Sequence, residues 1–384
     1  MKWVEFQSPV GLTAMVLLLA GCGEAPQSAL VSAPAPPSAN LDGLAPGWNI
    51  IEPGGDTVCS DGSPYKFFVR PGAPDKLMVY FQGGGACWNG GTCDPDLKPT
   101  YYVNLENTDP AGYDGIFRFE NPENPIRDHS VVFAPYCTGD VHIGDAVTRY
   151  EAPAVEEHAA HSFEIQHKGF VNADAVLDWT YKHFYKPAEI FVTGSSAGSI
   201  PSPYYAMRIA EQYPDARIAQ LGDASGGYRM QGQEVRPHDR WGTMERLMQS
   251  PDFADIESES FDYASLYINA SKRHPDIAFA QYDTAEDEAQ KFFLSLAGQE
   301  PPSLLSIIDA NQTDIRKGVS NFHSYIAGGD LHTILVQPEF YAYHVDGTSV
   351  RDWVVKLVNG EELVDVRCSD CAEAEVTEGF VSQR

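Results

Sequence analysis

Ser196 lies at the centre of residues 194–198, GSSAG, which match the pattern G-x-S-x-G. This short pattern also occurs by chance in unrelated chains, so its context decides its value. The apolar run 189–193 precedes it and a predicted helix, 204–213, follows it. In a nucleophile elbow, small neighbours let the serine project above a sheet without clashes. We therefore predict that Ser196 is a nucleophile, and the alternative is a glycine-rich turn without chemistry.

A serine hydroxyl becomes nucleophilic at neutral pH only with a nearby base. In α/β hydrolases the base is a histidine that follows the serine and the acid in the chain. His332 comes directly after the loop residues 328–331 that end the apolar run 321–327. This position predicts that His332 is the base. The other histidines beyond the serine are His238, His274, His323, which falls inside that predicted strand, and His344, which we place on a predicted helix.

The base in turn needs a carboxylate to orient it. Asp283 directly follows the apolar run 277–282 and precedes the predicted helix 286–296, which is the strand-end position that this role requires. Asp223 is the competing carboxylate, after the run 216–221. We predict that Asp283 is the orienting acid and that Asp223 holds the geometry of a loop.

A tetrahedral intermediate also needs preorganised N–H donors for its oxyanion. Ala197 follows the nucleophile and is expected to supply one backbone N–H. Residues 82–88, QGGGACW, follow the apolar run 76–81 and are well placed to supply another, because glycines let the backbone approach a ligand. The alternative is an ordinary turn.

Six apolar runs of strand length end in Gly, Asp or Ser clusters and are followed by helix-like segments. This order predicts an α/β fold with a mostly parallel central sheet, flanked by helices such as 169–184, and with a helical insertion at about 236–274. Ligands bind outside the carboxyl ends of strands in such sheets. The candidate residues all lie at those ends.

The N-terminal residues 1–21 read as a lipoprotein signal peptide, because their apolar stretch is too short to span a bilayer. Residues 19–22, LAGC, resemble a bacterial lipobox, so Cys22 is the expected lipidation site. Simple secretion and an uncleaved anchor are the alternatives. We expect an exported envelope lipoprotein, in the outer membrane because glycine follows Cys22, that contacts the membrane only through this anchor.

Residues 22–47 are rich in Ala, Pro and Ser and are predicted to be a flexible tether. Residues 48–384 form a single predicted catalytic domain, folded up to about Cys371 and followed by a short polar tail. We expect a monomer. The formal net charge of −28 argues against nucleic acid as a partner, because phosphate binding needs an excess of Lys and Arg.

Six cysteines remain after Cys22, an even number that favours disulfides in an oxidising compartment. The pairs predicted are Cys87 with Cys93 around the glycine-rich loop, Cys368 with Cys371, and by elimination Cys59 with Cys137. Sequence alone does not prove this connectivity. The alternative is a zinc site or a redox pair at residues 368–371, which lack a second ligand pair, so we expect no metal.

Taken together, residues 83–88, 194–198, 282–283 and 332–335 resemble the pectin acetylesterase and Notum family of serine carboxylester hydrolases, in the same motif order. The resemblance covers about residues 48–371. It implies an α/β-hydrolase-like fold, deacylation of an O-acyl ester and no cofactor. It also implies that Gly84, Gly85 and Ala197 are the oxyanion donors and that Ser196, Asp283 and His332 are the triad.

The sequence departs from the family at Gln82, where the family usually has glutamate, and at Ala86, where plant members carry a tryptophan nearby. Both positions affect the substrate side of the pocket. The expected activity is removal of acetyl or other short O-acyl groups from a small-molecule or glycan ester, including polysaccharide. The alternatives are a Notum-like long-acyl deacylase and a non-catalytic envelope protein that binds carbohydrate or a partner.

Overall fold

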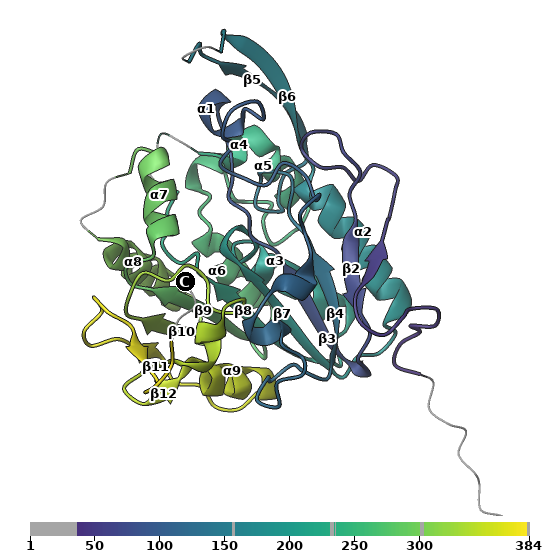
Figure 1. The fold of residues 1–384 in the computed structure, drawn as a ribbon, viewed down its shortest axis with the longest axis vertical. Coiled ribbons are helices and arrows are strands. Elements are labelled where there is room, and N and C mark those ends of the chain that lie inside the picture. The colour runs from purple at the N-terminus through teal and green to yellow at the C-terminus, as the bar shows by residue number, and fades with distance from the viewer. Residues whose placement is uncertain (1–36, 156–157, 231–233, 235, 300–302, 382–384) are drawn as a thin grey trace, which may run out of the picture. The chain divides into compact units, whose positions relative to one another are not determined.

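The computed structural model describes residues 37–155, 158–230, 234, 236–299 and 303–381. Within them, nine strands form one twisted sheet (Figure 1). In spatial order these are β1 (Asn49–Ile51), β2 (Phe67–Arg70), β4 (His129–Ala134), β3 (Ala73–Phe81), β7 (Glu189–Ser195), β8 (Arg217–Asp223), β9 (Ala278–Thr284), β10 (Phe322–Ala327) and β13 (Val366–Arg367).

The sheet is parallel from β4 to β13, and at the other edge β2 runs antiparallel to both of its neighbours, β1 and β4. This confirms the predicted α/β class with a mostly parallel sheet. All six predicted strands are present, with ends within three residues of the predicted ones. Because seven parallel strands end at the same edge, the loops after β3, β7, β8, β9 and β10 meet there.

Helices cover both faces of the sheet, because strand side chains alternate between two apolar cores. Leu77, Val79 and Phe81 of β3 point to the core shared with α2, α3 and α6, whereas Met78 and Tyr80 point to the core shared with α8 and α9. The helices are α1 (Gly90–Cys93), α2 (Gly169–His183), α3 (Ser202–Gln212), α4 (His238–Trp241), α5 (Thr243–Leu247), α6 (Ala264–Arg273), α7 (Glu288–Leu296), α8 (Leu304–Arg316) and α9 (Val350–Asn359).

Local signals explain where several of these helices begin and end. The Ser303 side chain accepts a hydrogen bond from the backbone N–H of Ser306 at the start of α8, and Ser349 does the same for Asp352 in α9. Gly360 ends α9 with φ +68°, a left-handed conformation that glycine adopts without strain. Elements α4, α5 and α6 form the predicted helical insertion at 236–274.

Two small sheets lie outside the main one. The hairpin of β5 (Ala146–Ala152) and β6 (His161–His167) projects at the top of Figure 1. Strands β12 (Thr348–Ser349), β11 (Tyr343–Val345) and β14 (Glu375–Val376) form the other. His344 therefore lies in a strand, and its predicted helical position is wrong. The predicted polar tail is also wrong, because β14 pairs with β11 beyond Cys371.

The folded part begins earlier than the predicted boundary at residue 48. Ala39 pairs with Phe184 in an isolated bridge, and the backbone N–H groups of Tyr185 and Lys186 donate to Ser38 O. The end of the predicted tether thus packs against the chain that follows α2. The predicted signal peptide and Cys22 lie outside the described residues. Within the part of the chain that the structure describes, no helix has the length and apolar character needed to cross a bilayer.

All three predicted disulfides are present in the structure: Cys59 with Cys137, Cys87 with Cys93, and Cys368 with Cys371. The first links the segment before β2 to the loop after β4. The third closes the turn after β13, whose backbone contacts the glycines that precede His332. Crosslinks of this kind are common in proteins of oxidising compartments.

Candidate active site

Ser196 lies in a strained turn directly after β7. Its φ of +54° is in the left-handed region, which a non-glycine residue occupies only when its surroundings impose it. The short 3-10 helix Ser196–Gly198 continues the turn toward α3. A Cβ at Gly194 would overlap Gly198 O, and one at Gly198 would overlap Phe81 O. Both glycines are therefore required by close packing, as expected for a nucleophile elbow.

The glycine-rich loop after β3 packs directly against this turn. A Cβ at Gly83 would lie 2.7 Å from Ser196 Cβ and 2.6 Å from Ser195 O, so only glycine fits. Gly84 and Gly85 have φ values of +153° and +80° and line the same cleft as Ser196. Ala197 lines a second cavity together with Gly85 and Ser196. The three predicted oxyanion residues are thus grouped around the serine.

His332 also lines the cleft that contains Ser196. Its Nδ1 lies 2.8 Å from Asp287 Oδ2 and 3.0 Å from Oδ1, so this nitrogen donates to the carboxylate and Nε2 is left for the cleft. Asp287 is fully buried. Its Oδ1 also accepts from the backbone N–H groups of Ala289 and Gln290, so it caps α7. These bonds fix the carboxylate and, through it, the ring of His332.

The prediction that Asp283 orients His332 is therefore wrong, because the carboxylate bonded to the imidazole is that of Asp287. Asp283 Oδ1 accepts from Gly226 N at 2.8 Å and from Gln290 Nε2 at 3.0 Å, away from the imidazole. Asp283 belongs to β9 itself, so the alternation of the strand sets its direction, whereas Asp287 lies four residues later at the start of α7. An aspartate just before an apolar helical run is a recognisable N-cap, so the sequence marks Asp287 as a helix cap but not as the partner of His332.

Asp223, at the end of β8, links the nucleophile turn to the loop of the base. Its Oδ2 accepts from Ser195 Oγ at 2.7 Å and from Leu335 N at 3.0 Å, and its Oδ1 accepts from Ile334 N at 2.9 Å. This agrees with the predicted role in loop geometry. Burial is the main effect that raises the pKa of Asp223, to about 6, although these hydrogen bonds favour its charged form.

Opposing effects set the pKa of His332. Burial lowers it, but the hydrogen bond and the charge of Asp287 raise it more, so the pKa lies above the ordinary value of 6.5. A base must be neutral to accept a proton, so activity should fall as the pH drops through this raised pKa.

We expect an NMR titration of the His332 Cε1 proton in Ser196→Ala to give a pKa above 6.5. Adding Asp287→Asn should lower the pKa of His332 below 6.5. Burial disfavours the charged imidazole, and the carboxylate that stabilises this charge is then absent. An unchanged pKa in the double variant would contradict the Asp287 assignment.

A small apolar cavity of about 50 Å³ adjoins Ser196. Its wall combines the glycine-rich loop with the helical insertion. Trp88 and Trp241 contribute indole rings, and Phe293 of α7 lines both this cavity and the outer cleft. The helical insertion therefore contributes to the site. One of its apolar residues, Met248, is 48% exposed and lies outside the core. Ile200 and Tyr263 also line the cavity.

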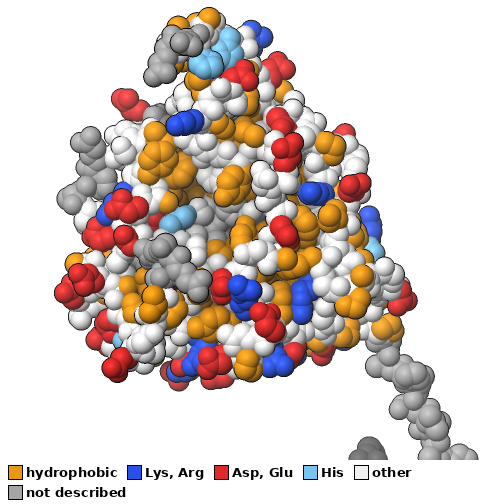
Figure 2. All heavy atoms as spheres, viewed as in Figure 1, with side chains coloured by type: hydrophobic (Ala, Val, Ile, Leu, Met, Phe, Trp, Pro, Cys, Tyr) orange, Lys and Arg blue, Asp and Glu red, His pale blue; other side chains and the backbone are white. Residues whose placement is uncertain are grey.

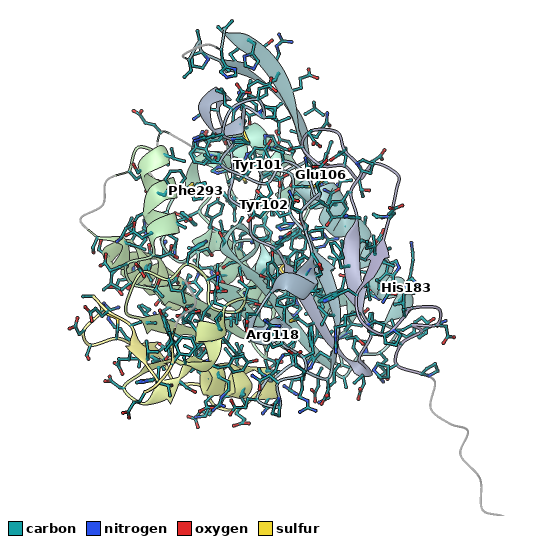
Figure 3. All side chains as sticks on the ribbon, viewed as in Figure 1. Tyr101, Tyr102, Glu106, Arg118, His183 and Phe293 are labelled. Atoms are coloured by element: carbon teal, nitrogen blue, oxygen red, sulfur yellow. A yellow bond between two sulfur atoms is a disulfide. The ribbon has the colours of Figure 1, made fainter. Side chains whose placement is uncertain are left out.

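The outer cleft is open and larger, about 510 Å³, and has Ser196 and His332 in its wall. Tyr101 and Tyr102 line it on one side and Phe293 on the other (Figure 3). Figure 2 shows a hollow in the centre of this face, bordered mainly by hydrophobic and uncharged atoms. The site thus has a small apolar side and a larger open side with tyrosines.

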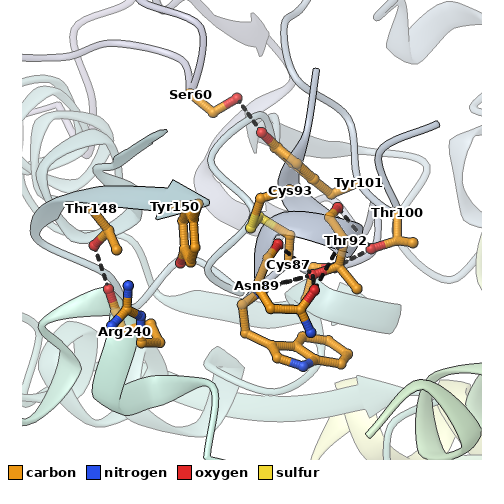
Figure 4. Close-up of a disulfide and its surroundings, with 12 residues drawn as sticks. Ser60, Cys87, Asn89, Thr92, Cys93, Thr100, Tyr101, Thr148, Tyr150 and Arg240 are labelled. Carbon is orange, nitrogen blue, oxygen red and sulfur yellow. Dashed lines mark hydrogen bonds between the residues drawn. A yellow bond between two sulfur atoms is a disulfide. The ribbon is translucent and has the colours of Figure 1, made fainter. Parts of the chain in front are cut away.

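The Cys87–Cys93 disulfide supports the wall of the site (Figure 4). Asn89 caps α1 within the crosslinked loop, and Thr100 Oγ1 donates to Ala86 O at 2.7 Å. Trp241 Nε1 donates to Cys87 O at 2.7 Å, which ties the insertion to the same loop. These contacts hold the glycine-rich segment against the nucleophile turn.

Among the residues that the structure describes, two groups of side chains have the types that bind metals, and neither lines the cleft. Cys87 and Cys93 lie near His167, and both sulfurs are committed to their disulfide. Asp94 and Asp96 lie near His161, where the 3.2 Å ion pair between Asp94 and His161 accounts for the grouping.

Comparison with known proteins places the chain in a family. Residues 49–260 match the family model described as Pectinacetylesterase, which is more than half of the chain. The chain belongs to the pectinacetylesterase family. The match includes the glycine-rich loop and Ser196, whereas Asp287 and His332 lie beyond it.

Two relatives extend the comparison for this pectinacetylesterase family member. Palmitoleoyl-protein carboxylesterase NOTUM of Schmidtea mediterranea is 26% identical over 150 residues, which are 37% of this chain and 26% of that protein, so the match spans about a quarter of that relative. The structure of the Wnt deacylase Notum from Drosophila matches with a TM-score of 0.55 and 18% identity, over 81% of this chain and 93% of that one. This likeness confirms the α/β-hydrolase-like fold.

Proposed function

We propose that the protein is a serine carboxylester hydrolase that removes acetyl or other short O-acyl groups from a small-molecule or glycan ester, including polysaccharide. The observation that carries this proposal is the hydrogen bond between His332 and the buried Asp287, in a cleft that His332 shares with Ser196 in its strained turn. The family match supports the same reaction class. The reaction needs no cofactor.

In the proposed mechanism, Ser196 Oγ attacks the ester carbonyl carbon while His332 Nε2 takes its proton. Backbone N–H groups of Ala197 and of Gly84 or Gly85 stabilise the oxyanion. The tetrahedral intermediate collapses, the C–O bond to the alcohol breaks, and His332 returns the proton to the leaving oxygen. Water then attacks the acyl-enzyme by the same route and releases the acid. Asp287 holds the imidazole and stabilises its charged form throughout.

The size of the apolar cavity supports a short acyl group. A cavity of about 150 Å³ holds benzene, so the space of about 50 Å³ beside Ser196 has room for roughly two carbon atoms. The bulky side chains of Trp88, Trp241 and Phe293 line it. A Notum-like long chain needs many more carbons than this space takes.

A panel of esters from acetyl to octanoyl tests this proposal. We expect kcat/KM to be highest between acetyl and butyryl and to fall with longer chains. A deep channel would instead add about 0.8 kcal/mol per buried CH₂, so a steady rise up to octanoyl would contradict the proposal in favour of a long-acyl deacylase.

Phe293→Ala tests whether the cavity limits the length of the acyl chain, because the Phe293 ring lines both the cavity and the open cleft. The octanoyl-to-acetyl ratio of kcat/KM should rise by about tenfold or more, since several methylene groups gain space. Phe292→Ala is the matched control, because the neighbouring ring is 51% exposed. Equal ratios in both variants would show that the cavity does not limit chain length.

The non-catalytic alternative is a binding protein that keeps this fold. A fluorophosphonate probe separates the two, because only an activated serine reacts with it. Labelling of the protein that disappears in Ser196→Ala supports the enzyme, and no labelling at pH 8 supports the alternative.

We also propose that the protein is an exported envelope lipoprotein, acts as a monomer and does not bind nucleic acid. Three disulfides support an oxidising compartment. The lipobox-like residues 19–22 support lipidation at Cys22. The net charge of −28 supports the proposal that the protein does not bind nucleic acid.

A further inference from the structure

The open cleft continues beyond Ser196 into a second cavity. The two share Tyr101, Tyr102 and Tyr113 in their walls. The cavity beyond Ser196 adds amide and hydroxyl groups from Asn104, Asn107 and Thr108. In the proposed function the acyl group occupies the small apolar cavity, so this open side receives the alcohol part of the ester.

Tyr102 presents a fixed aromatic surface in this space. Its backbone N–H donates to Gly84 O at 3.0 Å, and its ring packs on Gly84, where a Cβ would lie 2.6 Å from Tyr102 Cδ2. The residue is nevertheless 55% exposed. A tyrosine held by the glycine-rich loop with most of its surface uncovered can stack against the apolar C–H face of a sugar ring at little entropic cost.

Tyr113 is arranged as a hydrogen-bond donor. Gln82 is buried, and its Oε1 accepts from Tyr136 N at 3.0 Å, which directs its Nε2 to Tyr113 Oη at 2.6 Å. An amide N–H can only donate, so the Tyr113 oxygen accepts there and its own proton points elsewhere. Tyr113 lies where the two cavities meet, so this proton is available for an acceptor in the cleft.

The charge of this region selects against anions. Among the described residues that line the two cavities there is no Lys or Arg, and the one carboxylate, Asp109, accepts from Ala111 N at 2.9 Å. His332 is neutral when it acts as the base, so an anionic sugar would lose water here without gaining a cation, which is costly. The net charge of −28 adds long-range repulsion.

We propose that this space is a binding site for an uncharged, hydroxyl-rich alcohol, the sugar ring of a neutral glycan, which stacks on Tyr102 and accepts a hydrogen bond from Tyr113. The proposal rests on the esterase function above and narrows its substrate class. A site for the uronic acid units of an acidic polysaccharide is the outcome that it excludes.

The test compares kcat/KM for three acetyl esters: acetylated xylo-oligosaccharide, acetylated oligogalacturonide and ethyl acetate. The neutral glycan should exceed the acidic one by about tenfold or more. Tyr102→Ala should lower the ratio of neutral glycan to ethyl acetate by about tenfold, mainly through KM, because a binding surface is lost. Tyr113→Phe should lower it by about three- to tenfold, the value of one hydrogen bond. Tyr185→Ala, a tyrosine 53% exposed after α2, is the control and should leave the ratio unchanged.

A preference for the acidic glycan, or an unchanged ratio in both cleft variants, would overturn this inference while leaving the esterase proposal intact. If the wild type hydrolyses none of the three esters, the esterase proposal fails. Calorimetry with deacetylated xylo-oligosaccharide then still decides the cleft: binding that Tyr102→Ala weakens supports the sugar site, and no binding refutes it.

Discussion

Ser196→Ala is expected to lower kcat/KM for a short acyl ester by about four to six powers of ten, since nucleophile and base act as a unit. The fold should survive, because the side chain lies in a cleft and the strained backbone comes from packing of the neighbouring glycines. The measurement is ester hydrolysis, with circular dichroism to confirm the native fold.

Ser199→Ala is the matched control for this change. Ser199 lies three residues later and is buried, where its Oγ shares a hydrogen bond with Ser225 Oγ at 2.5 Å. Loss of this hydrogen bond should lower the free energy of unfolding by about 1 kcal/mol. It should lower kcat/KM much less than Ser196→Ala does. Comparable losses of activity in both variants would mean that Ser196 is only a structural residue.

Asp287→Asn is expected to lower kcat by about four powers of ten, because the amide cannot hold His332 in the required tautomer or stabilise its charged form. Asp283→Asn should change kcat by less than about tenfold, since Asp283 bonds to Gly226 and Gln290 instead. Both substitutions are isosteric and remove one buried carboxylate, so each controls for the other. Steady-state kinetics of the two variants decides between the carboxylates.

The stability of Asp283→Asn gives a second readout. Burial is the main effect that raises the pKa of Asp283, to about 7, and Oδ2 has no hydrogen-bond partner among the described residues. A raised carboxyl pKa means that ionisation destabilises the fold as the pH rises from the unfolded value near 4 through 7. Asp283→Asn should therefore raise the melting temperature more at pH 8 than at pH 6. Loss of activity in Asp283→Asn with normal activity in Asp287→Asn would restore Asp283 as the acid.

Features that depend on neighbours in the chain were predictable from the amino-acid sequence. The elbow around Ser196 was predictable because its glycines, its strand and its helix lie within about 25 residues, and local geometry needs only these. The six strands were predictable from their apolar runs, because strands buried on both faces are rich in apolar side chains. The position of His332 in the cleft was predictable from its place in a loop after a strand. The disulfide pairs were predictable from the spacing of the cysteines.

The carboxylate that meets the base is set by contacts between distant parts of the chain. Asp283 and Asp287 are four residues apart, and both precede or begin α7. The loop from β9 to α7 bonds to the loop of His332, with Ala285 N donating to Ala327 O and Glu286 N donating to Gly329 O, and this pairing carries Asp287 to the imidazole. Such contacts join residues more than 40 positions apart.

The same reason applies to the other features that only the structure revealed. Ala39 packs beside Phe184, β14 pairs with β11 and not with a sequence neighbour, and His344 takes a strand from that pairing. The alcohol side of the cleft joins Tyr102 to Tyr113 and Gln82 through long-range packing. A local sequence pattern indicates the propensity of a segment to form a helix or a strand. The pairing of distant segments depends on the free energy of the whole fold, which a short segment does not determine.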